Sequence, residues 1–190
     1  RSRGLGGVYE SGARDRGMDV TTECYPYAAG MTRMEAATFD GDWRGSIGID
    51  YGDLEYAETG ERLTAESFAR YRKTGGWVIL HMIPDDIVDM AVASPLTSIA
   101  SDGILQGGKG HPRTAGSYTR VLGHFVRGRG ALTLMDALRK SSLMPAQRLE
   151  GRTPSMRNKG RVRAGADADL VAFDADRVID RATYAEPALP

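Results

Sequence analysis

The amino-acid sequence predicts an α/β protein of parallel strand–helix units that ends in a small β appendage. The first observation is a regular succession of helix, strand, helix and strand with short connections, at about 64–73, 77–82, 84–93 and 96–100. The second observation is a change of character after residue 150. Two short strands are expected there around a glycine turn, with no helix between them, at 160–165 and 168–173.

Composition limits the kind of protein. The chain has 190 residues, enough for one domain with a small appendage, and its 25 basic residues balance its 25 acidic ones. No charge bias favours nucleic acid or a membrane surface, and the longest apolar run, 77–83, is too short to span a bilayer. The single cysteine, Cys24, excludes an internal disulfide framework. We therefore expect a cytoplasmic protein without a nucleic-acid or membrane partner.

The first third of the chain contains one clear strand. Residues 8–16 are expected to be the tail of a helix that ends at Gly17, and residues 18–24 a strand rich in β-favouring side chains. That strand leads into Tyr25, the first of two tyrosines on a rigid turn. Residues 31–62 show no sustained period, so we expect an irregular, functional insertion whose acids lie on a solvated surface.

Capping residues set the helix boundaries in the rest of the chain. Thr64 is a good N-cap, and Pro84 fits the first helical position of the next helix. After the strand at 96–100 comes a glycine-rich loop, and a helix is expected from about Ser117. Thr133 with Asp136 forms an acidic capping box for a further helix.

A carboxylate stands where the strand at 96–100 opens into this loop. Asp102 occupies the place that an α/β barrel offers to a catalytic side chain. Arg113, expected on the same loop, offers a planar fork of donors to a carboxylate or a phosphate. The alternative is that Asp102 only stabilises a turn, because Ser-Asp-Gly is common turn chemistry. The local pattern leaves both interpretations open.

Several motifs occur in an order that identifies a family resemblance. They are 19–27 (DVTTECYPY), 101–103 (SDG), 111–113 (HPR), 120–123 (RVLG), 165–173 (GADADLVAF) and 180–184 (DRATY). Together they resemble the C-terminal half of N-acyl-D-amino-acid deacylases (D-aminoacylases), in the metal-dependent amidohydrolase superfamily. The resemblance covers essentially the whole chain.

The resemblance implies a fold and a function. Residues 1–150 would be the C-terminal part of a distorted (β/α)8 barrel, and residues 151–190 part of a small β-sandwich with a C-terminal tail. The activity would be zinc-dependent hydrolysis of the amide bond of N-acyl-D-amino acids. Asp102 would be the general acid/base and a potential metal ligand. Arg113, Tyr25 and His111 would form the substrate-binding side, the first two holding the α-carboxylate.

Two departures from the family pattern qualify these expectations. Met31 stands where the family often has a serine close to the substrate carboxylate, so the preferred substrate is open. The chain has three histidines and no His-x-His pair, whereas one or two zinc ions need several histidine ligands. Those ligands are expected before Arg1, in an N-terminal half that would be this chain's partner. The chain alone is therefore expected to be inactive.

Two other functions remain as alternatives. One is a cyclic-amide hydrolase of the same superfamily, such as a dihydroorotase or a hydantoinase. Recognition of a free carboxylate by Arg113 favours a linear substrate, although dihydroorotate also carries a carboxylate. The other is a non-catalytic half-barrel.

Overall fold

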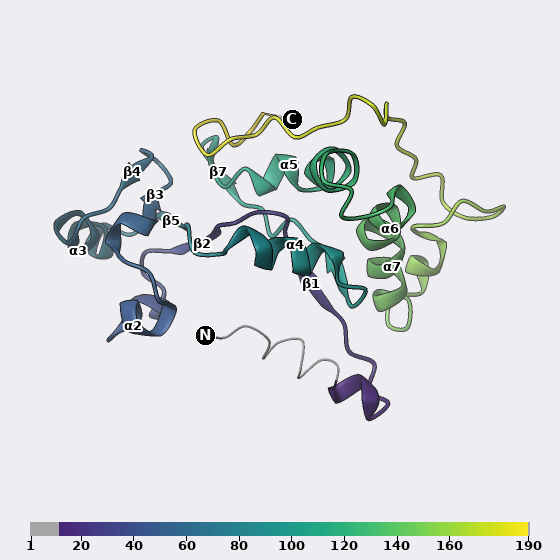
Figure 1. The fold of residues 1–190 in the computed structure, drawn as a ribbon, viewed down its shortest axis with the longest axis horizontal. Helices are drawn as coiled ribbons and strands as arrows, with labels where there is room; N and C mark the ends of the chain where they lie inside the picture. Colours follow the sequence, from purple (N-terminus) through teal and green to yellow (C-terminus); the bar gives the residue numbers. More distant parts are fainter. Residues whose placement is uncertain (1–11, 190) are drawn as a thin grey trace.

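The computed structural model describes residues 12–189, which fold into two parts that lie side by side (Figure 1). The helix tail expected at 8–16 lies partly outside this range, and residues 12–15 are helical. The α/β part contains β1 (Thr22–Cys24), α4 (Asp85–Ala93), β6 (Thr97–Ile99), α5 (Arg113–Arg120), α6 (Leu134–Leu138) and α7 (Met144–Leu149). Wider helical turns continue α5 as η3 (Val121–Gly128) and join α6 to α7 as η4 (Arg139–Leu143).

The α/β part is organised around two parallel strands. β1 pairs with β6 so that Thr22 lies opposite Thr97 and Cys24 opposite Ile99. Ile99 is fully buried in a core with side chains from α4, η3 and α6, namely Val88, Val92, Val121, Phe125 and Ala137. The parallel pair covered by helices confirms the α/β fold class. The strand expected at 18–24 is shorter, because only its last three residues have a partner strand in the described chain.

The strand expected at 77–82 belongs to a different sheet. β5 (Trp77–Leu80) lies between β2 (Gly30–Arg33) and β3 (Leu54–Tyr56) and is antiparallel to both. β4 (Glu61–Arg62) completes the sheet order β2-β5-β3-β4. The expectation of a parallel unit at this place was wrong, because a short apolar run shows that a strand is buried but not the direction of its neighbours.

The insertion expected to be irregular at 31–62 is instead an ordered module that extends to β5. Besides these strands it contains α2 (Trp43–Ile47), α3 (Ala65–Thr74) and the 3₁₀ turns η1 (Ala37–Phe39) and η2 (Tyr51–Asp53). Phe39, Trp43 and Phe68 form its buried core, with Trp43 stacked on Phe68 at a centroid distance of 5.1 Å. These elements are mostly two to five residues long, too short for a hydrophobic period to emerge from the sequence.

The C-terminal segment begins with the 3₁₀ turn η5 (Pro154–Asn158), and no strand forms between residues 159 and 189. The strands expected at 160–165 and 168–173 are therefore absent from the described chain. Val162 and Val171 are 92% and 84% exposed, because no described segment pairs with them. The assignment of residues 151–190 to a small β-sandwich stays a prediction.

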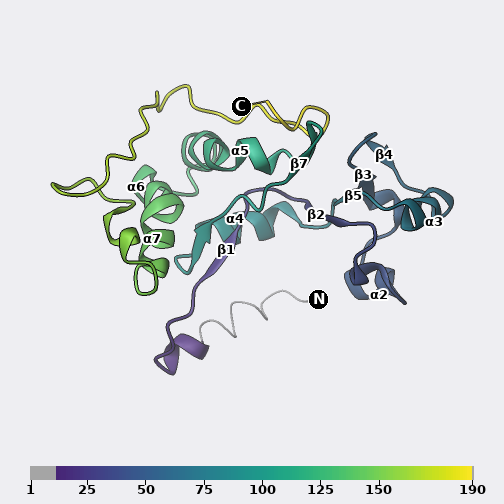
Figure 2. The same cartoon turned by 180° about the vertical axis from the view of Figure 1, so that it is seen from behind.

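The last part of the chain lies against the α/β part. Figures 1 and 2 show this segment running alongside α5 in both views. Arg127 donates to the carbonyl oxygen of Val178 at 2.7 Å, and Arg120 pairs with Asp180 at 3.0 Å. Within residues 12–189, the helices lack the combined length and apolarity that crossing a bilayer requires.

Candidate functional site

The candidate site lies at the carboxyl ends of β1 and β6. Because the two strands are parallel, their carboxyl ends meet at one edge, and the amide of Ala100 donates to the carbonyl of Cys24 across it at 2.9 Å. Tyr25 directly follows β1, and Asp102 lies three residues beyond β6. The fold thus brings together two of the side chains that the sequence analysis singled out.

Arg113 reaches the same edge from the start of α5. The expected start at Ser117 was four residues too late, since α5 begins at Arg113, directly after Pro112. The ring of Pro112 holds φ at −58°, a value suited to a helix start. The hydroxyl of Ser117, expected to cap the helix, instead donates to the carbonyl of Arg113 at 2.7 Å inside its first turn. Arg113 is therefore fixed by a helix and does not lie on a loop.

The short hairpin of β7 (Leu105–Gln106) and β8 (Lys109–Gly110) separates Asp102 from α5. The two ends of this connection touch at Gly103. A Cβ atom placed on Gly103 would lie 2.5 Å from the Cα of Thr114, well inside contact distance. Gly103 therefore allows the main chain beside Asp102 to approach the residue beside Arg113.

Asp102 and Arg113 form the central contact of the site. Nη2 of Arg113 donates to Oδ2 of Asp102 at 2.6 Å, and Nε donates to the Asp102 carbonyl oxygen at 2.9 Å. The Arg113 side chain is 2% exposed, whereas that of Asp102 is 65% exposed. Asp102 also has a φ of 46°, the only positive φ of a non-glycine residue in the described part of the chain. Such backbone conformations recur at functional sites, where the surroundings hold them in place.

Tyr25 covers the guanidinium of Arg113. The Cζ atom of Arg113 lies 4.2 Å from the centroid of the Tyr25 ring, a cation–π arrangement that fixes the guanidinium plane. Nη1 of Arg113 is buried and has no hydrogen-bond partner among the described residues. A buried charged donor without a partner is costly unless a ligand supplies an acceptor. Arg113 therefore has one buried donor group without a partner beside Asp102.

His111 contacts the main chain through both of its ring nitrogens. Its Nε2 lies 2.9 Å from the carbonyl oxygen of Ala29, to which it donates, and its Nδ1 accepts the amide proton of Arg113 at 3.0 Å. Burial, together with the neighbouring Arg113, lowers the pKa of His111 to about 3, so the ring is neutral. Both ring nitrogens are occupied by the protein. These contacts support the start of α5, and a substrate contact by His111 stays a prediction.

Residues of the C-terminal segment pack against Tyr27 and His111, beside the site. The sequence reasoning did not predict these contacts. The hydroxyl of Tyr27 donates to Asp180 at 3.4 Å. Burial, and next the negative charge of Asp180, raise the pKa of Tyr27. Tyr184 lies edge-on to His111 at a centroid distance of 5.2 Å, and burial raises the pKa of Tyr184 to about 12. The 180–184 motif of the family resemblance was the signal that could have found these residues.

The insertion module contributes a largely buried hydrogen-bonded pair near this ring cluster. Nε2 of His81 lies 3.0 Å from Oε2 of Glu55, whose side chain is 10% exposed. The expectation that the insertion's acids are all solvated was wrong for Glu55. Burial, assisted by the charge of Arg62, lowers the pKa of His81.

The described residues do not by themselves form a zinc site. No group of three or more histidine, cysteine, aspartate or glutamate side chains gathers at metal-binding distance within residues 12–189. The carboxylate of Asp102 is engaged by Arg113. Burial raises the pKa of Cys24 to about 11, so its thiol stays protonated and is a poor metal ligand. The donor set present supplies at most Asp102, whereas a zinc site needs three or four ligands.

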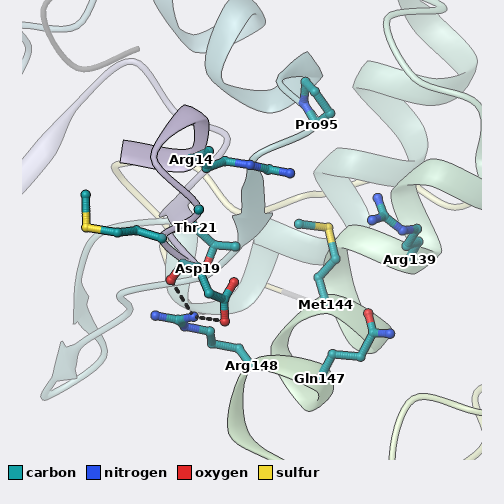
Figure 3. Close-up of a pocket in the computed structure, with 10 residues that line it drawn as sticks. Arg14, Asp19, Thr21, Pro95, Arg139, Met144, Gln147 and Arg148 are labelled. Atoms are coloured by element: carbon teal, nitrogen blue, oxygen red, sulfur yellow. Dashed lines mark hydrogen bonds and ion pairs between the residues drawn. The ribbon is translucent and has the colours of Figure 1, made fainter. Parts of the chain in front are cut away.

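A separate groove of about 470 Å³ lies at the opposite ends of the strands. Figure 3 shows Arg148 from α7 reaching Asp19, where its Nη1 donates to Oδ2 at 2.8 Å. Pro95, which lies shortly before β6, also lines this groove, so it belongs to the amino-terminal end of the strand pair. It is therefore not part of the site formed by Asp102 and Arg113.

The fold of the described residues is that of solved D-aminoacylase-type amidohydrolases. The N-acyl-D-glutamate deacylase of Bordetella bronchiseptica, solved with zinc and a phosphonate inhibitor, superposes on 96% of this chain with a TM-score of 0.77 and 29% identity. A D-aminoacylase structure, described as defining a novel subset of amidohydrolases, covers 98% of this chain with a TM-score of 0.75 and 27% identity. These alignments span 39% and 40% of the solved chains.

Comparison of the amino-acid sequence with known proteins finds deacylases as relatives. The N-acyl-D-glutamate deacylase of Alcaligenes xylosoxydans xylosoxydans is 34% identical over 188 residues, and the D-aminoacylase of the same organism is 29% identical over 176. No family model matches the sequence. Over 93% of its own length the chain is similar to N-acyl-D-glutamate deacylase, and it matches the C-terminal part of N-acyl-D-amino-acid deacylases. It spans about a third of the curated relatives, 36% and 35% of their lengths.

Proposed function

We propose that this chain supplies the carboxylate-recognition and proton-transfer side of an N-acyl-D-amino-acid deacylase, which hydrolyses the amide bond of its substrate with zinc. The observation that carries the proposal is the buried guanidinium of Arg113, with Nη1 unpartnered, beside the exposed carboxylate of Asp102. The names of the relatives, deacylases of N-acyl-D-glutamate and N-acyl-D-aspartate among them, support the substrate class.

Arg113 and Tyr25 bind and orient the substrate. The guanidinium takes the α-carboxylate of the N-acyl amino acid through its unpartnered donor, and the Tyr25 ring keeps the guanidinium plane fixed. His111 accepts the Arg113 amide proton and so holds the first turn of α5 in register. Fixing one end of the substrate converts binding into orientation of the amide at the other end.

Asp102 transfers the proton. It accepts a proton from the water whose oxygen attacks the amide carbon, and returns it to the nitrogen as the carbon–nitrogen bond breaks. Zinc occurs in the solved Bordetella relative. Here the described residues offer only Asp102 as a ligand, so further zinc ligands must come from outside them. We place the protein in the cytoplasm, with a small N-acyl amino acid as its ligand and the N-terminal half of the barrel as its structural partner.

A ligand panel tests this function. We expect the chain to bind N-acetyl-D-alanine, to bind neutral N-acetyl-D-alaninamide much more weakly, and to bind cyclic dihydroorotate more weakly than the linear acid. Isothermal titration calorimetry measures all three affinities. Tighter binding of dihydroorotate than of N-acetyl-D-alanine would favour the cyclic-amide hydrolases. Equal binding of the acid and the amide would contradict carboxylate recognition and leave the non-catalytic half-barrel as the better account.

A further inference from the structure

We propose that Asp102 is an internal counter-ion of Arg113 that the substrate carboxylate displaces, so that substrate binding itself frees Asp102 for proton transfer. This inference rests on the proposed function and adds a control device to the same site. Without a bound carboxylate, the acid that should accept a proton is held on the arginine that should accept the substrate. Asp102 is therefore free to accept a proton only when the bound substrate carries a carboxylate.

The contact between the two side chains is asymmetric. The guanidinium of Arg113 is 2% exposed and lies under the Tyr25 ring at 4.2 Å, so it cannot move without losing both its burial and its stacking. The carboxylate of Asp102 is 65% exposed and is bound by one donor, Nη2 at 2.6 Å. When a competitor arrives, the exposed carboxylate is the partner that leaves, because water solvates it readily.

Charge balance makes the two carboxylates competitors. A buried guanidinium needs a counter-ion, since an unpaired buried charge is strongly destabilising. Nη1 of Arg113 is buried and has no partner while Asp102 is bound to Nη2, so one donor of the guanidinium stays unsatisfied until a second acceptor reaches it. Two carboxylates on one guanidinium repel each other, and the repulsion weakens the hold of Nη2 on the exposed one. One positive charge therefore retains one carboxylate at a time.

The backbone lets the Asp102 side chain leave without unfolding the loop. Nε of Arg113 donates to the main-chain carbonyl of Asp102 at 2.9 Å, separately from the contact with the carboxylate. This second bond maintains the unusual φ of 46° at Asp102. The side chain can therefore rotate towards the reacting water while its main chain stays anchored to Arg113.

The test is whether removing the carboxylate of Asp102 makes the binding of an N-acyl amino acid tighter or weaker. Asp102→Asn removes the competing charge but tolerates a positive φ, and Asp102→Gly removes it with no backbone strain. In both variants we expect N-acetyl-D-alanine to bind about three- to ten-fold more tightly than in the wild type, the range for a charged hydrogen bond discounted for solvent exposure. Affinity for N-acetyl-D-alaninamide should not change. Asp19→Asn, which removes the exposed partner of Arg148, is the matched control and should change neither affinity.

The outcomes separate this inference from the proposed function. Tighter acid binding in both Asp102 variants supports displacement. Equal or weaker acid binding in a folded Asp102 variant, with clear binding in the wild type, overturns displacement and leaves carboxylate recognition intact. If neither the wild type nor any variant prefers the acid to the amide, both proposals fail. Circular dichroism establishes that each variant is folded.

Discussion

The contact between Gly103 and Thr114 gives the sharpest structural prediction, because it joins the residues next to Asp102 and Arg113. In Gly103→Ala, the new Cβ would lie 2.5 Å from the Cα of Thr114 and 2.9 Å from its Cβ. The first of these is a backbone atom, so the clash is not relieved by rotating a side chain. Either the loop after β6 or the start of α5 must shift.

The cost follows from this geometry. Forcing extra volume into a close contact typically destabilises a protein by about 1–3 kcal/mol. For a chain of 190 residues this corresponds to a decrease of roughly 3–10 °C in the melting temperature. The displacement also separates Asp102 from Arg113, so we expect weaker binding of N-acetyl-D-alanine. Thermal unfolding and calorimetry measure the two effects on the same sample.

Gly52→Ala is the matched control for this prediction. A Cβ on Gly52 meets no atom within 4 Å, and its φ is not in the positive range. We expect the Gly52 variant to melt within a few degrees of the wild type and to bind the acid normally. If the Gly103 and Gly52 variants have the same melting temperature and the same affinity, the close approach is not what holds the site together.

Three further predictions concern the supports of the site. The pKa of His111, about 3 in the fold, lies below the ordinary value of 6.5, so between these values the unfolded chain binds a proton that the folded chain does not. The free energy of unfolding should therefore fall as the pH drops from about 6.5 towards 3, by up to about 1.4 kcal/mol per pH unit. His111→Gln should flatten that slope, as measured by urea unfolding at several pH values. A slope that the substitution leaves unchanged would contradict a buried neutral ring. Phe68→Ala should cost about 3–5 kcal/mol by opening the insertion core, whereas Met135→Ala, at a position 71% exposed, should cost little; similar urea midpoints for the two would refute that core. After dialysis the chain should hold no stoichiometric zinc and should not hydrolyse N-acetyl-D-amino acids, and finding bound zinc together with turnover would show that its own residues suffice.

The sequence predicted which strand-end residues lie close together better than it predicted the surrounding fold. Asp102 and Tyr25 could be predicted to lie near each other because Tyr25 directly follows β1, Asp102 lies three residues beyond β6, and the carboxyl ends of parallel strands meet. The start of α5 was misplaced because Ser117 resembles a cap, while the stronger constraint on φ comes from Pro112. Local pattern therefore located the residues but not all of their supports.

Contacts between residues far apart in the sequence account for most of the features that the sequence analysis did not predict. The antiparallel neighbours of β5 lie 22 to 50 residues away, as in the register pairs Tyr56 with Val78 and Gly30 with Leu80, and no local pattern encodes them. The second bond of His111, to the carbonyl of Ala29, spans 82 residues in the same way. A ring nitrogen that looks available in the sequence is thus occupied in the fold.

The central claim is that Arg113 recognises a carboxylate, and one ratio tests it most directly. Arg113→Lys keeps the positive charge but removes the planar set of donors and the stacking on Tyr25. Losing a charge-assisted hydrogen bond costs roughly 1.5–3 kcal/mol, or about ten- to a hundred-fold in affinity. The measurement is the ratio of the affinities for N-acetyl-D-alanine and N-acetyl-D-alaninamide, in the wild type and in Arg113→Lys. We predict a large ratio in the wild type that falls by about ten-fold or more in the variant, whereas an unchanged ratio would contradict carboxylate recognition by Arg113.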